Sequence, residues 1–192
     1  EPGSIWVGTS KNGLIHYDEM ARKVEHYKPS DRAHSINGNV ARALLKQNNH
    51  LWIANDTLGV SVLNLISRQF DTLAYEGGAD DIIGQNPIFI GMAQDKNGGV
   101  WLANINRGLV YWDVKSNTKK SVSVLSEKYD LRKMMVQSLF VDSQDMLWIG
   151  TRNSGLYHYN PATGQGYKFS DKTRAESLTG MSIRAISEHP KG

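Results

Sequence analysis

The chain has 192 residues, with 22 Lys and Arg against 19 Asp and Glu, a formal net charge of +3, 40% hydrophobic residues and no cysteine. This length suits one all-β domain with a sizeable core or part of a larger ring, and the lack of cysteine excludes disulfides, thiolate chemistry and cysteine-ligated zinc. The basic residues are scattered in pairs such as Lys119-Lys120, unlike a nucleic-acid-binding stripe, and no apolar run approaches the roughly 18 residues that cross a bilayer.

Four short strands, named a to d, are predicted in each of several similar units. The chain opens with strand b at 5–9, strand c at 14–17 and strand d at 23–27. Later strands, in chain order and beginning with a strand a, are expected at 40–45, 51–55, 60–63 and 69–73, then 88–93, 100–104, 109–112 and 121–125, then 136–141, 147–151, 156–159 and 167–169, with a last strand a at 183–186. The runs are short, rich in β-branched and aromatic residues and interrupted by glycine, so helices are not expected.

A tryptophan marks strand b of every unit. Trp6, Trp52, Trp101 and Trp148 are 46, 49 and 47 residues apart, and each lies in an apolar run that ends in Gly or Ala followed by Thr or Asn. A polar turn and a Gly-Leu or Gly-Val pair follow in each copy. Similarity at a fixed period of this size is typical of repeat architectures.

The repeat predicts an all-β fold of the β-propeller type. A sheet of four short strands cannot bury both faces alone, but radial stacking covers each face with a neighbouring sheet, and the tryptophan supplies bulk between sheets. We expect about four four-stranded blades at 1–192, as part of a larger, about seven-bladed propeller. A solenoid is the less favoured alternative.

Both ends of the chain fall at the same point of the repeat. The segment 1–4 precedes the first strand b without a strand a of its own, which indicates a cut inside a longer gene product, and a strand near 183–188 is phased to complete the first blade. Either these ends close a four-bladed ring, or the piece belongs to a longer ring or pairs with a second copy. Four blades is the lower limit of the usual range, so we favour the longer ring.

The amino-acid sequence of the repeat resembles that of a known family. The Asp-containing turn at 141–146, Leu-Trp-Ile-Gly-Thr at 147–151 and Asn-Ser-Gly-Leu-Tyr-His-Tyr-Asn-Pro at 153–161 resemble the two-component regulator propeller repeat. The copy at 51–64 departs most, with Ala54-Asn55 for Gly-Thr and Leu63 where the other copies have Tyr or Trp.

The resemblance implies a place in a larger receptor. Such repeats build the periplasmic sensor region of Bacteroidetes hybrid two-component regulators, in which two propellers precede a β-sandwich, a membrane span and a cytoplasmic histidine kinase. These sensors bind glycan fragments and switch on polysaccharide-utilisation genes. The chain itself is then a sensing segment, and the membrane is reached only through other parts of the parent.

Candidate ligand-binding residues lie in loops at one end of the blades. The b–c turns vary while their flanks do not, and the d–a loops are the longest connections. Both carry groups that hydrogen-bond sugar hydroxyls or pair with carboxylates and sulfates. These candidates are Asn12, Asn55, Asp56, Asn104, Asn106, Arg107, Arg152, Asn153, Arg132 and Lys133.

Other residues that could suggest a binding or metal site fall at positions of the repeat. Trp112 aligns with Tyr17 and Tyr159, and His16 aligns with His158, so we interpret all of these as packing residues. The histidines lack metal-ligand spacing, 95–98 lacks the further ligands of a calcium loop, and no nucleophile motif occurs. We therefore expect no metal, no cofactor and no catalysis.

The sequence thus predicts a non-catalytic, ligand-sensing periplasmic propeller of a two-component receptor. The expected partners are an oligosaccharide, possibly acidic, the remaining blades and domains of the parent, and a second copy in a homodimer, but no nucleic acid. Two alternatives stay open: a propeller lyase acting on a polysaccharide or small molecule, and a protein–protein assembly scaffold.

Overall fold

A computed structural model describes residues 3–31, 34–56, 59–73, 87–105, 107–169 and 182–189. The chain divides into two compact units, Glu1–Ala79 with Gly84–Phe89 and Asp80–Ile83 with Ile90–Gly192, and each is described by itself. The described residues are almost entirely β-strand and turn, which confirms the predicted all-β, propeller-type fold.

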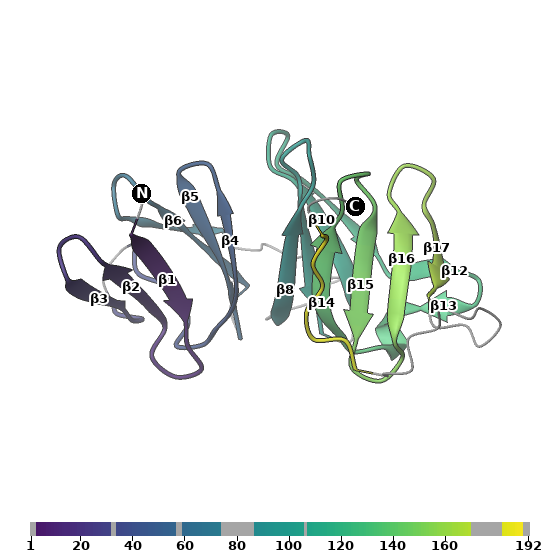
Figure 1. The fold of residues 1–192 in the computed structure, drawn as a ribbon, viewed down its shortest axis with the longest axis horizontal. Coiled ribbons are helices and arrows are strands. Elements are labelled where there is room, and N and C mark those ends of the chain that lie inside the picture. Colours follow the sequence, from purple (N-terminus) through teal and green to yellow (C-terminus); the bar gives the residue numbers. More distant parts are fainter. Residues whose placement is uncertain are drawn as a thin grey trace. The chain divides into compact units, whose positions relative to one another are not determined.

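Two antiparallel sheets form the first unit (Figure 1). Blade 1 has the order β1 (Ser4–Gly8), β2 (Leu14–Asp18) and β3 (Lys23–Tyr27). Blade 2 has the order β4 (Ala41–Gln47), β5 (His50–Asn55), β6 (Val60–Asn64) and β7 (Phe70–Leu73). Blade 1 begins with strand b, as the phase of the repeat predicts.

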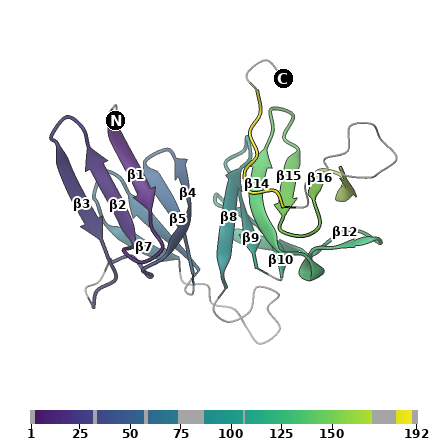
Figure 2. The ribbon, with the colours of Figure 1, turned by 60° about the horizontal axis from the view of Figure 1, so that its bottom comes forward.

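Two more four-stranded sheets follow (Figure 2). Blade 3 comprises β8 (Phe89–Gln94), β9 (Val100–Asn104), β10 (Gly108–Asp113) and β11 (Thr118–Val122), and blade 4 comprises β14 (Val136–Val141), β15 (Leu147–Thr151), β16 (Leu156–Asn160) and β17 (Gln165–Lys168). Between them lie a small hairpin, β12 (Val124–Ser126) with β13 (Tyr129–Asp130), and a short 3-10 helix, η1 (Leu131–Lys133). Strand d of blade 3, predicted at 121–125, therefore ends at Val122, because Val124 instead pairs with Asp130 in the hairpin.

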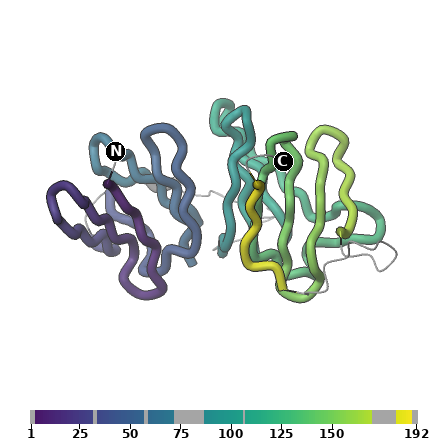
Figure 3. Tube along the Cα trace, viewed as in Figure 1, coloured from purple at the N-terminus to yellow at the C-terminus, as the bar shows by residue number. Residues whose placement is uncertain are grey.

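The last described segment, 182–189, runs along blade 4 (Figure 3). The Ile183 backbone N–H donates to the Thr151 carbonyl at 2.9 Å, as the Ala41 N–H donates to the Thr9 carbonyl at 2.8 Å between blades 1 and 2. Both bonds join residues 32 apart, so the segment takes the place of strand a of a following blade. It makes no strand ladder among the described residues, although a strand was predicted at 183–186.

Glycine permits this close approach between blades. A Cβ on Gly150 would lie 2.8 Å from the Ile183 carbonyl oxygen, and a Cβ on Gly8 would lie 2.6 Å from the Ala41 carbonyl oxygen. Both distances are too short for a real side chain. The Gly-Thr ending of strand b is therefore a blade-stacking feature.

Large aromatic and aliphatic side chains fill the space between sheets. In the second unit Trp101 of blade 3 meets Tyr159 of blade 4 edge-to-face, with ring centroids 5.9 Å apart, beside the buried Leu147 and Ile149. In the first unit Trp6 packs against a core that includes Leu51 of blade 2. The tryptophan face of one blade thus covers the aliphatic face of the next, as the repeat predicts.

One face of blade 1 is uncovered. Ile5 and Val7 are 52% and 45% exposed, whereas Leu51 and Ile53, at the same repeat positions in blade 2, are 3% and 0% exposed. The same positions in blade 4 are also buried. Side chains at repeat positions that are buried in other blades are therefore exposed in blade 1.

An aspartate caps the a–b turn in the second unit. Asp142 accepts backbone N–H bonds from Gln144 and Met146 at 3.0 and 2.9 Å, and the indole Nε1–H of Trp148 donates to its other oxygen at 2.7 Å. Asp95 plays the same part in blade 3, where the Tyr111 hydroxyl donates to it at 2.7 Å. This carboxylate fixes the turn to the face of its own sheet, so 95–98 is a structural turn.

Candidate functional site

The predicted site residues of the first unit are engaged in local structure. Asn55 is fully buried and its side-chain amide donates to the Ser61 hydroxyl at 2.7 Å. Asp56 forms an ion pair with Arg42, whose Nε lies 2.5 Å from the carboxylate. Asn12 is exposed in a turn that its backbone N–H closes by donating to Thr9.

Several predicted residues of the second unit do lie at one end of its blades. Arg107 and Asn153 are exposed, Asn104 is buried, and Asn106 lies outside the described residues. The Arg152 backbone N–H donates to the Met135 carbonyl at 2.8 Å, which places its turn beside the residues that follow η1.

The basic residues Arg132 and Lys133 of η1 belong to the same end. Arg132 forms a two-pronged pair with Asp130 at 2.9 and 2.8 Å, which lowers the pKa of that carboxyl to about 2. Lys133 is exposed, and no ion pair to a carboxylate is found for it within the described ranges. The predicted loop face is thus basic in the second unit, but Arg132 is already occupied.

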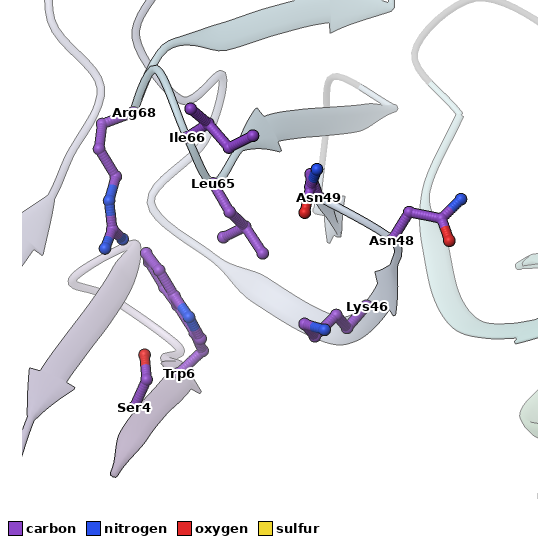
Figure 4. Close-up of a pocket in the computed structure, with 8 residues that line it drawn as sticks. All are labelled: Ser4, Trp6, Lys46, Asn48, Asn49, Leu65, Ile66 and Arg68. Atoms are coloured by element: carbon purple, nitrogen blue, oxygen red, sulfur yellow. The ribbon is translucent and has the colours of Figure 1, made fainter. Parts of the chain in front are cut away.

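A pocket of about 350 Å³ lies at the opposite end of the strands in the first unit (Figure 4). It opens between the start of β1, the β4–β5 turn and the β6–β7 turn. Its lining combines two cations, three hydrogen-bonding side chains and three apolar ones: Ser4, Trp6, Lys46, Asn48, Asn49, Leu65, Ile66 and Arg68.

The two turns that line the pocket are held together and held rigid. The Asn64 side-chain oxygen accepts the backbone N–H groups of Ile66 and Ser67 at 2.9 and 3.1 Å. The Leu65 N–H donates to the Asn49 carbonyl at 2.8 Å and so joins one turn to the other. These bonds fix the backbone from which Arg68 projects.

Arg68 reaches across the blade boundary to the tryptophan of the repeat. Figure 4 shows its side chain extending from the turn to the ring of Trp6, and its guanidinium carbon lies 5.3 Å from the ring centroid. This distance is within the range of a cation–π contact. The guanidinium also lies near the Tyr27 hydroxyl, whose pKa is raised by burial and by Glu25, with Arg68 opposing that rise.

A chain of polar contacts supports the Trp6 ring through the side chain of His16. The His16 ring stacks on the indole at 4.2 Å, its Nε2 lies 2.7 Å from the Ser4 hydroxyl, and its Nδ1 lies 3.2 Å from the Glu25 carboxylate. Hydrogen bonds from Lys23, from His16 and from Tyr27, in that order of importance, lower the pKa of Glu25 to about 2. Glu25 is therefore a carboxylate at neutral pH.

Blade 4 shows which part of this chain is special to blade 1. His158 packs on Trp148 with ring centroids 4.5 Å apart, as His16 does on Trp6. Met146 and Tyr167 stand where blade 1 has Ser4 and Glu25, and burial lowers the pKa of His158. Blades 1 and 4 share the His–Trp contact, while the Ser and Glu contacts are found in blade 1 and not in blade 4.

The sequence pattern did not predict this pocket, although one departure from the repeat indicates where it lies. Tyr159 occupies the space beside Trp101 in the second unit. The matching position in blade 2 is Leu63, the departure from the repeat noted above, and there Arg68 lies over Trp6 instead. A shorter side chain at a position that holds Tyr or Trp in the other blades marks the blade boundary at which space remains.

The described part of the chain offers no group of three or more His, Asp or Glu side chains able to hold a metal ion. Over the same ranges, no helix has the length and apolar character needed to cross a membrane.

Known proteins are similar to this chain in its repeat sequence. The family described as two-component regulator propeller matches residues 130–153, which confirms the expected resemblance. "Histidine kinase P4" of Formosa agariphila is 28% identical over 164 residues, covering 78% of this chain and 12% of that protein.

Solved structures share the fold. The extracellular domain of a one-component system of B. thetaiotaomicron superposes with a TM-score of 0.78 at 19% identity, over 99% of this chain and 24% of that one. The extracellular domain of a hybrid two-component system of the same organism gives 0.61 at 14% identity, over 97% and 29%. This chain therefore spans less than a third of each of these proteins.

Proposed function

We propose that this chain, which carries the two-component regulator propeller repeat on an all-β propeller-type fold, is a non-catalytic sensing segment of a periplasmic receptor. The relative named a histidine kinase supports a parent with that activity. The ligand proposed is a glycan or oligosaccharide.

The observation that carries this proposal is the polar pocket of the first unit. Asn side-chain amides offer both donors and acceptors, and a Ser hydroxyl can do either, which are the groups that match sugar hydroxyls. Asn48, Asn49 and Ser4 supply them at the pocket, and Leu65 and Ile66 supply apolar surface for the C–H faces of a sugar. The volume is at the lower end of the range for small-molecule sites.

The proposed partners within the receptor are further blades and a second copy. The exposed Ile5 and Val7 occupy positions that a preceding blade covers elsewhere in the repeat, so a further blade of the parent is the proposed occupant of that face. Signalling would then be a shift between dimer arrangements that differ in their contacts with the ligand.

A second candidate function is hydrolytic activity at the same pocket. Ser4, His16 and Glu25 follow one another with the connectivity of a nucleophile, a base and an orienting carboxylate, and Ser4 lines the pocket. The same contacts also support Trp6, because the His16 ring stacks on its indole.

Calorimetric titration with a panel of oligosaccharides separates these functions. Saturable binding without product supports the sensor, and product formation that Ser4→Ala abolishes supports the enzyme. Silence of the full-length receptor towards neutral and acidic glycans alike would overturn the sensor and favour the assembly scaffold.

A further inference from the structure

The pocket of the first unit contains positive charge with no carboxylate to balance it. Lys46 and Arg68 both line it, and none of its lining residues is Asp or Glu. Neither cation forms an ion pair with a carboxylate over the ranges that the structure describes.

Some basic residues of the chain are neutralised locally. Ion pairs with a carboxylate occupy four of them, at 2.5 to 3.4 Å: Lys23, Arg42, Lys96 and Arg132. What distinguishes Lys46 and Arg68 is that both line one pocket that has no acidic lining residue. A concave surface with charge of one sign attracts ligands of the opposite sign.

Arg68 is held in advance of binding. Its backbone N–H donates to the Asn64 carbonyl at 2.9 Å, its φ of 59° is fixed by the turn, and its guanidinium rests over Trp6. Its Nη1 is buried and has no hydrogen-bond partner among the described residues, so the group has unused donor capacity. A guanidinium is a planar fork that suits the paired oxygens of a carboxylate or sulfate.

We propose that this pocket binds the acidic sugar of a glycan, a uronate or a sulfated unit, through Arg68 and Lys46. The inference rests on the proposed function, which makes the ligand a glycan. The positive charge of the pocket indicates that the bound sugar carries an anionic group. The sugar hydroxyls are bound by the side chains of Asn48, Asn49 and Ser4. The Trp6 ring supports the Arg68 guanidinium through their cation–π contact, and the His16 ring stacks on the same indole.

Calorimetric titration of the full chain with matched pairs of ligands tests this inference. Digalacturonate is compared with its methyl ester, and sulfated lactose with lactose, so that each pair differs in charge. We expect at least one acidic member to bind about tenfold or more tightly than its neutral counterpart, and more weakly as salt is raised. Arg68→Gln and Lys46→Gln each remove most of that preference, whereas Lys120→Gln, the same change on the exposed strand β11, keeps it.

The outcomes separate the two proposals. Equal binding of charged and neutral members, or a preference that survives both pocket substitutions, overturns the acidic-sugar site and leaves glycan sensing intact. Failure of every acidic and neutral ligand to bind overturns the acidic-sugar site in this chain, and the full-length receptor then decides the sensing function. Circular dichroism of Arg68→Gln shows whether the variant keeps the wild-type fold, and Lys46→Gln, at an exposed residue, provides the second reading.

Discussion

Replacing Asp142 by Ala tests how the repeat holds its turns. The substitution removes two backbone N–H bonds and the bond from the Trp148 indole. Water can replace the acceptor for the turn N–H groups, but the indole N–H is partly buried against the sheet. Hydrogen bonds to a charged group contribute about 1.5–3 kcal/mol, so we expect a loss of about 2–4 kcal/mol for Asp142→Ala. Asp142→Asn keeps one oxygen for the turn and should lose about half as much.

Asp113 provides the matched control for this prediction. It also accepts two turn N–H bonds, from Lys115 and Ser116, but no aromatic donor. Because Asp113 is solvated and water can replace its bonds to the turn, Asp113→Ala should lower the urea midpoint clearly less than Asp142→Ala does. In urea denaturation followed at the amide signals of β15, Asp142→Ala should lower the midpoint by about 1–2 M, given a slope of about 2 kcal/mol/M. Equal losses for the two alanine variants would refute the role given to the Trp148 bond.

Three further predictions follow from burial, close approach and charge. Ile53→Ala should destabilise the chain by about 2–5 kcal/mol in urea denaturation, because Ile53 is fully buried. Val7→Ala, at the same repeat position but exposed, should cost under about 1 kcal/mol. Similar losses for the two variants would contradict the conclusion that this face of blade 1 is uncovered. Gly150→Ala should release the segment 182–189, seen as faster amide exchange of Ile183; unchanged exchange would show that the contact does not hold the segment. Because the pKa of Glu25 falls from 4.5 to about 2 on folding, the stability it contributes is present above about pH 4.5 and lost as the pH falls to 2; Glu25→Gln should flatten thermal stability over that window, and a parallel pH profile would contradict it.

The sequence was sufficient to predict the blades because packing repeats. Every strand b carries Trp between two apolar residues, and that pattern alone places Leu51, Leu147 and their neighbours between sheets. The hairpin β12–β13 was missed because 121–125 is β-rich throughout, and only the pairing of Val124 with Asp130 ends strand d early. Local composition does not specify which of two partners a strand takes.

The site was harder to predict because it depends on what lies between blades. Asn55 and Asp56 have the right chemistry for ligand binding, yet Asn55 is fully buried with its amide nitrogen bonded to Ser61, and Asp56 pairs with Arg42. Arg68 is one of 22 basic residues in the sequence, and only its position over Trp6 distinguishes it. The departure at Leu63 was visible, but its consequence, space beside the tryptophan of the preceding blade, required the stacking of the two sheets.

An NMR titration of the isotopically labelled chain with the tightest-binding glycan of the panel tests the central claim most directly. Trp6 has a counterpart in every other blade, so the indole N–H signals provide internal references within one experiment. Binding at the pocket predicts that the Trp6 indole and the Asn48 and Asn49 side-chain amides shift, while the Trp101 and Trp148 indoles do not. Shifts confined to the loops around Arg107, Lys133 and Arg152 at saturation would contradict it.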